Sequence, residues 1–233
     1  MNDAPPARRR LLLVEDHPAT RAGLAACFAV EPDFEVCGET ASWKEALALV
    51  RALRPDALLL DLQLPDGTGW GLIETLAASG ELPPTLVFSV FPEAAHAGRL
   101  LRAGARGYLP KDTPLERVVA AVRKILAGHL VVSDRVATQL LGQALGQGAA
   151  SAADQEAREL QALSDRELQV LQMLSQGLIN KDIATRLGLS AKTVGTYKAR
   201  LMEKLGVSTT PELQRLAAQR LLQDECLAPP ESS

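Results

Sequence analysis

Residues 58–67 read Leu-Leu-Leu-Asp-Leu-Gln-Leu-Pro-Asp-Gly, an apolar run that ends in a turn sequence. A short apolar run closed by Pro, Asp and Gly is typical of a strand buried on both faces, as in a parallel sheet. Asp61 ends this strand, and open α/β sheets bind their ligands at the carboxyl ends of their strands. We therefore expect Asp61 to be the reactive group. The rest of the chain is expected either to modify this carboxylate or to respond to its modification.

Similar apolar runs alternate with segments of helical periodicity on both sides of Asp61. Strands are expected at 11–14, 34–37, 57–60, 85–88 and 107–109, and helices at 19–28, 42–53, 70–78, 93–103 and 113–127. This alternation predicts an α/β doubly wound five-stranded parallel sheet. Ser42 with Glu45 predicts a capping box, and Thr113 before Pro114 predicts an N-cap with proline at the first helical position. The first strand lacks a following Gly-x-Gly-x-x-Gly, which argues against a dinucleotide site.

Composition limits the class of protein. A length of 233 residues favours two domains, and an apolar content of 47% is enough for their cores. The sequence contains no run of about 18 apolar residues, which a membrane span would need. Arg8–Arg10 precedes only four apolar residues, too few for a secretion signal of about 7–15. Cys27, Cys37 and Cys226 share no metal or disulfide spacing, which fits a reducing cytoplasm. We expect a cytoplasmic protein.

The charge is unevenly distributed along the chain. The net charge is -3, which argues against a generally basic nucleic-acid binder. Residues 1–128 carry 14 Lys/Arg against 16 Asp/Glu, whereas residues 162–210 carry 7 against 4. Any contact with DNA is therefore expected in the C-terminal part.

Polar residues stand at the ends of four predicted strands: Glu15 and Asp16, Asp61, Ser89, and Lys111. Three carboxylates at one edge of a sheet would repel one another unless a cation lies among them. Oxygen ligands of this kind suit Mg²⁺, which shares its remaining positions with water and phosphate. A carboxylate that attacks a phosphoryl group also needs its developing charge neutralised, which a metal, an ammonium and a hydroxyl could do.

The ordered motifs Val-Glu-Asp-His-Pro, Leu-Asp-Leu-Gln-Leu-Pro-Asp-Gly, Phe-Ser-Val and Gly-Tyr-Leu-Pro-Lys-Asp resemble those of a response-regulator receiver domain. The resemblance implies a flavodoxin-like receiver at residues 8–128, in which Asp61 accepts a phosphoryl group from a sensor histidine kinase. It assigns Mg²⁺ to Glu15, Asp16, Asp61 and the backbone carbonyl of Gln63. It assigns the phosphoryl oxygens to Ser89 and Lys111, and a switch role to Tyr108. Val90 departs from the family, which often has Ala there.

Structural alternatives exist for each of these residues. A lone Asp or Lys at a strand end is usually a solvated loop residue, and Tyr108 could be a core residue. His17 precedes Pro18 at a helix start, so we interpret it as a neighbour of the helix cap and not as a catalyst or ligand. Trp43 and Trp70 are interpreted as packing residues.

The C-terminal part begins after a tether at 129–159, which contains a predicted helix at 136–145 and then a Gly/Ala/Ser run. Ser164 with Glu167 predicts a capping box, and Asn180 and Ser190 are expected to cap two further helices. Those two, at 180–187 and 191–205, are separated by the three residues of a helix-turn-helix. The second of them carries Lys192, Lys198, Arg200 and Lys204 among small polar residues, as in a helix that enters the major groove.

The motifs Leu-Ser-Asp-Arg-Glu-Leu-Gln-Val-Leu, Gly-Leu-Ile-Asn-Lys-Asp-Ile-Ala and Leu-Ser-Ala-Lys-Thr-Val-Gly-Thr-Tyr-Lys resemble a LuxR-type helix-turn-helix, expected at residues 160–225. The whole chain therefore resembles a NarL/FixJ-class response regulator. The resemblance implies a homodimer through the helix at 211–222 and binding to inverted half-sites of double-stranded DNA. It assigns DNA contacts to Lys181, Lys192, Thr193, Thr196, Tyr197, Lys198 and Arg200. Gly195 and Tyr197 depart from the family, which often has Lys and His there.

We therefore expect a phosphorylation-dependent transcription factor that is not an enzyme. One rival is a phosphohydrolase that uses Asp61 as a transient nucleophile. Such enzymes generally have a second carboxylate two residues later, where this chain has Gln63. The other rival is a DNA-binding or adaptor protein that acts without phosphorylation, and the loss of an acidic residue would favour it. Every acidic residue of the motif is present.

Overall fold

The computed structural model describes residues 8–91, 93–144, 159–160 and 162–222. The chain divides into two compact units, Met1–Ala144 and Leu145–Ser233. The Gly/Ala/Ser run of the predicted tether lies outside the described residues. Among the described residues, no helix is both long and apolar enough to cross a membrane.

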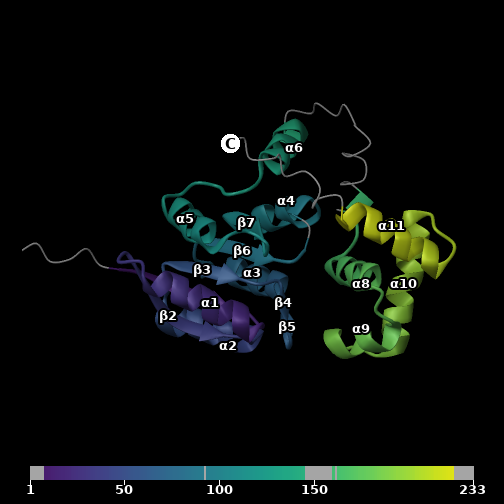
Figure 1. Cartoon of the computed structure of the whole chain (residues 1–233), viewed down its shortest axis with the longest axis horizontal. Helices are drawn as coiled ribbons and strands as arrows, with labels where there is room; N and C mark the ends of the chain where they lie inside the picture. The colour runs from purple at the N-terminus through teal and green to yellow at the C-terminus, as the bar shows by residue number, and fades with distance from the viewer. Residues whose placement is uncertain (1–7, 92, 145–158, 161, 223–233) are drawn as a thin grey trace, which may run out of the picture. The chain divides into compact units, whose positions relative to one another are not determined.

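The first unit is built on a five-stranded parallel sheet in the order β2-β1-β3-β6-β7 (Figure 1). Its strands are β1 (Arg9–Val14), β2 (Phe34–Thr40), β3 (Ala57–Leu60), β6 (Thr85–Ser89) and β7 (Gly107–Pro110). Its helices are α1 (Pro18–Ala29), α2 (Trp43–Leu53), α3 (Gly69–Ala78), α4 (Glu93–Ala103), α5 (Leu115–Leu126) and α6 (Asp134–Ala144). The predicted doubly wound sheet is confirmed, and its strand order reverses between β1 and β3.

Two apolar layers enclose this sheet because side chains alternate between its faces. Leu12, Val14, Leu58 and Leu60 belong to one buried cluster, with residues of α2, α3 and α4. Leu11, Leu13 and Leu59 belong to the other, with residues of α1 and α5. Both faces are covered, which explains why the last four residues of β1 and all of β3 are apolar.

Residues 129–144, which the sequence analysis placed in the tether, pack on the first unit. The Tyr108 N–H donates to the Val131 carbonyl, and the Val131 N–H donates to the Arg106 carbonyl. Val136 of α6 is buried in the same apolar cluster as α4 residues. The predicted helix at 136–145 begins two residues earlier than expected, at Asp134.

Two local predictions in the first unit were incomplete or wrong, and one element was missed. The Ser42 side chain accepts from the Glu45 N–H as predicted. The Glu45 carboxylate, however, accepts from the Thr40 hydroxyl, so the reciprocal half of that capping box is not formed. Thr113 does not cap α5, because its N–H closes a turn onto the Pro110 carbonyl and Pro114 takes the cap position. A short antiparallel pair, β4 (Gln63–Leu64) and β5 (Gly67–Thr68), was not predicted.

The described part of the second unit contains helices α8 (Asp165–Ser175), α9 (Asn180–Leu187), α10 (Ala191–Leu205) and α11 (Thr210–Leu222). Both halves of the Ser164–Glu167 capping box are present, and Ser190 accepts from the Thr193 N–H as predicted. The prediction that Asn180 caps α9 was wrong, because Ile179 holds the extended cap conformation and Asn180 is the first helical residue. The core of this unit is formed by Leu168, Leu171, Ile183, Val194, Leu201, Leu213 and Ala217.

Candidate functional site: an acidic rim and an exposed helix

The backbone at the carboxyl edge of the sheet continues the hydrogen bonding of the strands. The Asp61 N–H donates to the Val14 carbonyl at 2.8 Å, and the Glu15 N–H donates to the Thr40 carbonyl at 2.9 Å. The Lys111 N–H donates to the Ser89 carbonyl at 3.0 Å. These bonds fix the first residue beyond each strand, so the register of the sheet positions the side chains that follow it.

Lys111 joins two buried carboxylates. Its Nζ lies 2.7 Å from Asp61 Oδ2 and 2.7 Å from Glu15 Oε1. The Asp61 and Glu15 residues are 1% and 2% exposed, so neither charge is solvated by bulk water. A buried carboxylate requires such a partner, because transfer from water strongly disfavours an unpaired charge.

The second carboxylate oxygen of Asp61 receives two weaker donors. The Ser89 hydroxyl donates to Asp61 Oδ1 at 3.1 Å, and the Gln63 N–H donates to the same oxygen at 3.2 Å. The predicted residues Glu15, Asp61, Ser89 and Lys111 therefore lie in one connected group, together with the backbone of Gln63. This arrangement offers a carboxylate nucleophile with an ammonium and a hydroxyl beside it.

Burial dominates the protonation of this site. It raises the pKa of Asp61 to about 6 against the lowering effect of the Lys111 ammonium, and the nearby Glu15 carboxylate raises it further. For Lys111, burial favours the neutral amine, but the Asp61 and Glu15 carboxylates outweigh it and hold the pKa above its usual value. Lys111 is therefore charged at neutral pH. Asp61 is ionised there too, but burial makes its ionised form less favourable than it would be in water.

A set of possible metal ligands lies at the same edge. Oxygen or nitrogen atoms of Glu15, Asp16, His17 and Asp61 all lie within 4.8 Å of one another. The Asp16 side chain is about one-third exposed, so a hydrated cation could reach it from solvent. Carboxylate oxygens are the ligands that Mg²⁺ usually takes from proteins, and one or two of them suffice because the ion retains several waters, so the carboxylates at this edge fit Mg²⁺.

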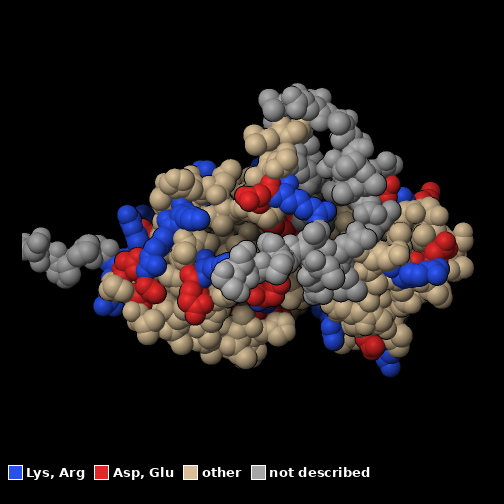
Figure 2. Space-filling view, turned by 45° about the horizontal axis from the view of Figure 1, so that its top comes forward, with Lys and Arg blue, Asp and Glu red and all other residues tan. Residues whose placement is uncertain are grey.

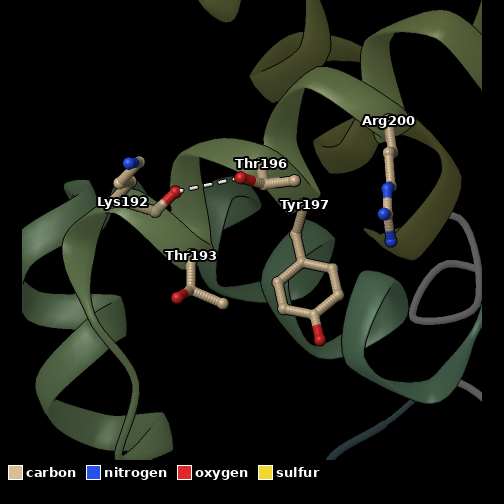
Figure 3. A pocket seen from close by; sticks show the side chains of 5 residues that line it. All are labelled: Lys192, Thr193, Thr196, Tyr197 and Arg200. Atoms are coloured by element: carbon tan, nitrogen blue, oxygen red, sulfur yellow. Dashed lines mark hydrogen bonds between the residues drawn. The ribbon is translucent and has the colours of Figure 1, made fainter.

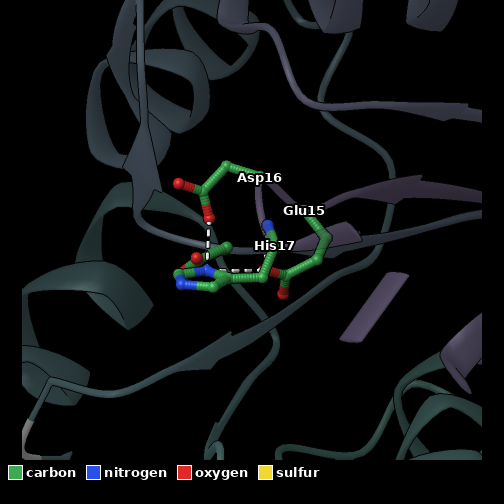
Figure 4. A group of neighbouring side chains, drawn as sticks. Glu15, Asp16 and His17 are labelled. Carbon is green, nitrogen blue, oxygen red and sulfur yellow. Dashed lines mark hydrogen bonds and ion pairs between the residues drawn. The ribbon is translucent and has the colours of Figure 1, made fainter. Parts of the chain in front are cut away.

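His17 lies closer to this group than the sequence analysis expected. Figure 4 shows its ring beside the Asp16 and Glu15 carboxylates. Its Nδ1 lies 2.8 Å from Asp16 Oδ1 and 3.5 Å from Glu15 Oε1. His17 is the N-cap of α1, but its side chain makes no capping bond. Its N–H instead donates to Glu15 Oε1 at 3.0 Å, which helps to orient that carboxylate.

Tyr108 lies inside the first unit. It is 1% exposed, and its hydroxyl donates to the Phe91 carbonyl at 2.6 Å. Phe91 follows β6 closely, so the bond connects β7 to the segment after Ser89. Val90 between them is 47% exposed.

The residues assigned to DNA contact lie on the exposed face of the helix-turn-helix. Lys192, Thr193, Thr196, Tyr197 and Arg200 line an open pocket on α10. Figure 3 shows Thr193, Tyr197 and Arg200 pointing to the same side of the helix, as their spacing of four and three residues requires. Lys181 of α9 is exposed, and Lys198 is partly exposed. In the described parts of the chain, no ion pair engages any of the basic residues in this assigned set.

Lys204 differs from the other basic residues of α10. Its Nζ lies 2.8 Å from Glu167 Oε2, and the Glu167 side chain is 3% exposed. Burial opposes ionisation of this carboxyl, but bonds from Lys204 and Ser164 hold its pKa below the usual value. Lys204 therefore stabilises the junction of α10 with the start of α8, and its ammonium is paired although its side chain is 43% exposed.

The face of the molecule shown in Figure 2 carries no large basic patch among its described residues. On the described residues of the face shown in Figure 2, acidic and basic side chains lie in small mixed groups. The net charge of -3 agrees with this picture. Attraction to DNA must therefore come from a local feature such as α10.

We call the edge of the sheet that carries Glu15, Asp16, Asp61, Ser89 and Lys111 the acidic rim. Two residues near it were missed by the sequence analysis. The Arg21 guanidinium donates to the Glu15 carbonyl at 2.6 Å, which ties α1 to the end of β1. The Asp66 carboxylate accepts from the first residues of α2, which precede it by more than twenty positions. Helical spacing places Arg21 one turn after His17, but only the folded loop could reveal the contact of Asp66.

Comparisons with known proteins agree with this geometry. Residues 11–123 match the family model of the response regulator receiver domain, and residues 161–217 match that of the bacterial regulatory proteins of the luxR family. The oxygen regulatory protein NreC of Staphylococcus epidermidis is 33% identical over 215 residues, which cover 91% of this chain and 98% of that protein. NreC of Staphylococcus aureus is 33% identical over 218 residues.

Solved structures share the fold. A LuxR-family two-component response regulator from Aurantimonas is 29% identical and covers 60% of this chain and 99% of its own, with a TM-score of 0.54. RcsB from Salmonella enterica, solved on a promoter with phosphomimetic BeF3-, is 22% identical and covers 91% of this chain and 99% of its own, with a TM-score of 0.63. The chain belongs to the two-component response regulators that control transcription through a receiver domain and a LuxR-type DNA-binding domain.

Proposed function

We propose that Asp61 is the phosphoacceptor of this regulator and that its donor is the phosphohistidine of a sensor kinase. One observation carries the proposal: a buried carboxylate, 1% exposed, has an ammonium on one oxygen and a hydroxyl on the other. An oxygen of Asp61 attacks phosphorus, the bond from phosphorus to the imidazole nitrogen breaks, and the electron pair stays on that nitrogen.

In this proposal the neighbours of Asp61 neutralise charge on the transferred group. Lys111 Nζ and Ser89 Oγ already contact opposite oxygens of Asp61, so both can turn to phosphoryl oxygens attached there. Mg²⁺ would be held by Glu15, Asp16, Asp61 and the Gln63 carbonyl, where it offsets negative charge on the phosphoryl group. The pKa of Asp61 near 6 leaves most of the carboxylate ionised and nucleophilic at neutral pH.

The conformational change that follows phosphorylation would begin at Ser89. Once the Ser89 hydroxyl bonds the phosphoryl group, the segment from Ser89 to Phe91 shifts, and Tyr108 responds through its bond to the Phe91 carbonyl. This two-state element would favour a homodimer through α11 and binding of inverted half-sites in double-stranded DNA. DNA contacts are assigned to Lys181, Lys192, Thr193, Thr196, Tyr197, Lys198 and Arg200, and a role on DNA places the protein in the cytoplasm.

We also propose the predicted boundaries, with a receiver at 8–128, a tether at 129–159 and a DNA-binding domain at 160–225. Residues 129–144 of this tether pack on the first unit, so they belong with that unit and not to a free linker.

The test is phosphorylation of the full chain by acetyl phosphate with Mg²⁺. Intact-protein mass spectrometry should show one added phosphoryl group on wild type and on Asp112→Asn, an exposed neighbour of Lys111, but none on Asp61→Asn. Footprinting on genomic DNA should then show stronger protection by the phosphorylated protein. An unmodified wild type would refute the phosphoacceptor. Equal protection by the phosphorylated protein and by Asp61→Asn would refute the switch and favour a regulator that acts without phosphorylation.

A further inference from the structure

The loop after Asp61 is fastened to the start of α2 by the carboxylate of Asp66. Asp66 Oδ1 accepts from the Trp43 N–H at 2.7 Å. Asp66 Oδ2 accepts from the Lys44 N–H at 3.2 Å and from the Ser42 hydroxyl at 2.7 Å. Trp43 and Lys44 are the first two residues of α2, whose N–H groups cannot be satisfied within the helix. Asp66 therefore caps a helix to which it does not belong.

The charge of Asp66 suits this position. The amino end of a helix carries a partial positive charge, which favours a carboxylate there. Partial burial opposes ionisation, but the bonds from the Ser42 hydroxyl and the α2 backbone hold the pKa of Asp66 below its usual value. The carboxylate is thus ionised at neutral pH, and its bonds are of the stronger, charge-assisted kind.

Two glycines allow the loop to approach its neighbours closely. A Cβ at Gly67 would lie 2.7 Å from Trp43 Cγ, and a Cβ at Gly69 would lie 2.3 Å from the Asp61 carbonyl oxygen. These distances are too short for any side chain at either position. The loop backbone is therefore pressed against the indole of α2 on one side and against the Asp61 backbone on the other.

The same loop carries the backbone of Gln63, which contacts the phosphoacceptor. Gln63 pairs with Thr68 in the β4–β5 hairpin, and Asp66 lies in the turn of this hairpin. The Gln63 N–H donates to Asp61 Oδ1, and its carbonyl is assigned to Mg²⁺ in the proposed function. A force that fixes Asp66 against α2 therefore also fixes the peptide groups on both sides of Gln63.

We propose that Asp66 is a positioning residue for the phosphorylation site. By anchoring the hairpin to α2, it holds the Gln63 carbonyl where Mg²⁺ binds and the Gln63 N–H where it orients Asp61. Asp66 touches neither the metal nor the phosphoryl group. This inference rests on the proposed function of Asp61. The competing explanation is that Asp66 only stabilises α2, in which case metal binding would not depend on it.

The test separates metal affinity from the rate at saturating metal, using the full chain. Calorimetric titration with Mg²⁺ should give a dissociation constant about 10-fold weaker for Asp66→Ala than for wild type, the lower end of the range for residues that orient metal ligands. The Mg²⁺ concentration for half-maximal phosphorylation by acetyl phosphate should rise by the same factor. The rate at saturating Mg²⁺ should stay within about twofold of wild type, since the reacting groups are intact. Asp66→Asn, which keeps one oxygen acceptor, should be intermediate.

Glu81→Ala is the matched control. Glu81 is also an exposed carboxylate that ties α2 to another segment, because its Oε2 lies 2.9 Å from the Arg51 Nε near the far end of that helix. It should leave Mg²⁺ affinity unchanged. Wild-type Mg²⁺ affinity in Asp66→Ala, with only a lower unfolding temperature, would overturn the inference and leave Asp66 as a helix cap. Equal loss in Glu81→Ala would overturn it in favour of a net-charge effect. A wild type that is not phosphorylated would refute the proposed function, and this inference with it.

Discussion

The acidic rim of the first unit and the exposed face of α10 differ in how their charged residues are stabilised. At the rim, Glu15, Asp61 and Lys111 are buried and joined by two contacts of 2.7 Å. On α10, Lys192 and Arg200 are exposed, and the Thr196 hydroxyl donates to the Lys192 carbonyl of its own helix. A buried charge must be paired within the fold, whereas an exposed one remains hydrated until a partner arrives.

This difference predicts which mutations will alter folding stability and which will alter DNA binding. Changes at the rim should alter folding stability as well as chemistry, because the groups there compensate one another. Changes on α10 should alter binding to DNA and leave stability nearly intact. Lys204 is the informative exception, since it belongs to α10 but pairs with the buried Glu167.

The largest effect is expected from Lys111→Met. The substitution leaves two buried carboxylates without a cation, which should lower the free energy of unfolding by about 3–5 kcal/mol at pH 7 in EDTA. Urea denaturation followed by circular dichroism measures it. Lys124→Met, an exposed lysine on α5, should stay within about 0.5 kcal/mol of wild type. In the Asp61→Asn background the cost of Lys111→Met should be smaller, and a full cost there would show that the pairing does not matter.

Asp61→Asn should have the opposite effect on stability. Because the pKa of Asp61 is near 6 in the folded chain and near 4 when unfolded, the folded state binds this proton more tightly. The contribution of Asp61 to wild-type stability should therefore fall as pH rises from about 4 to 6, by about 3 kcal/mol for two pKa units, relative to the pH profile of Asp61→Asn. The uncharged Asn avoids this loss, so without metal the variant should be more stable than wild type at pH 7. Parallel urea titrations at pH 4, 5, 6 and 7 test it, and identical pH slopes for both chains would contradict it.

The sequence predicted the parts of the rim that depend on one strand at a time. Each strand is a short apolar run, and the polar residue that follows it is visible in the chain, so Asp61, Ser89 and Lys111 could be named in advance. Lys111 bridges Asp61 and Glu15 across 50 and 96 residues, and this follows from strand order and register, which periodicity does not specify.

The features that the sequence did not predict depend on which of several residues takes a cap position or a charged partner in the folded chain. Asn180 is a good cap by preference, but the chain reaches extended geometry one residue earlier, at Ile179. Lys204 follows the basic pattern of α10, yet Glu167 is close enough to bind it. Asp66 was taken for a turn residue, because nothing in the local sequence shows that the turn reaches α2.

A smaller effect is expected from Arg200→Ala on the exposed face of α10. If Arg200 contacts a phosphate, the salt slope of DNA binding by the phosphorylated protein should decrease by about one, and the affinity at moderate salt should fall about tenfold. Its unfolding free energy should stay within about 0.5 kcal/mol of wild type. Lys204→Ala, on the same helix, should do the reverse, lowering stability and leaving the salt slope unchanged. Fluorescence anisotropy over a salt series, with matched urea melts, separates the two.

The smallest effect, Gly195→Ala, concerns the departure from the family on the same helix. Glycine inside a helix costs about 0.5–1 kcal/mol relative to alanine, because it loses more backbone freedom on folding. The nearest neighbour of an added Cβ would be Asn180 Nδ2 at 4.0 Å, so a methyl group fits without strain. Gly195→Ala should therefore raise stability by about that amount, measured by urea denaturation. If stability rises and DNA affinity is unchanged, Gly195 lowers the stability of α10 without contributing to DNA binding. If affinity falls while stability rises, Gly195 is needed for close approach of the α10 backbone to DNA, and the glycine then contributes to binding at the cost of helix stability.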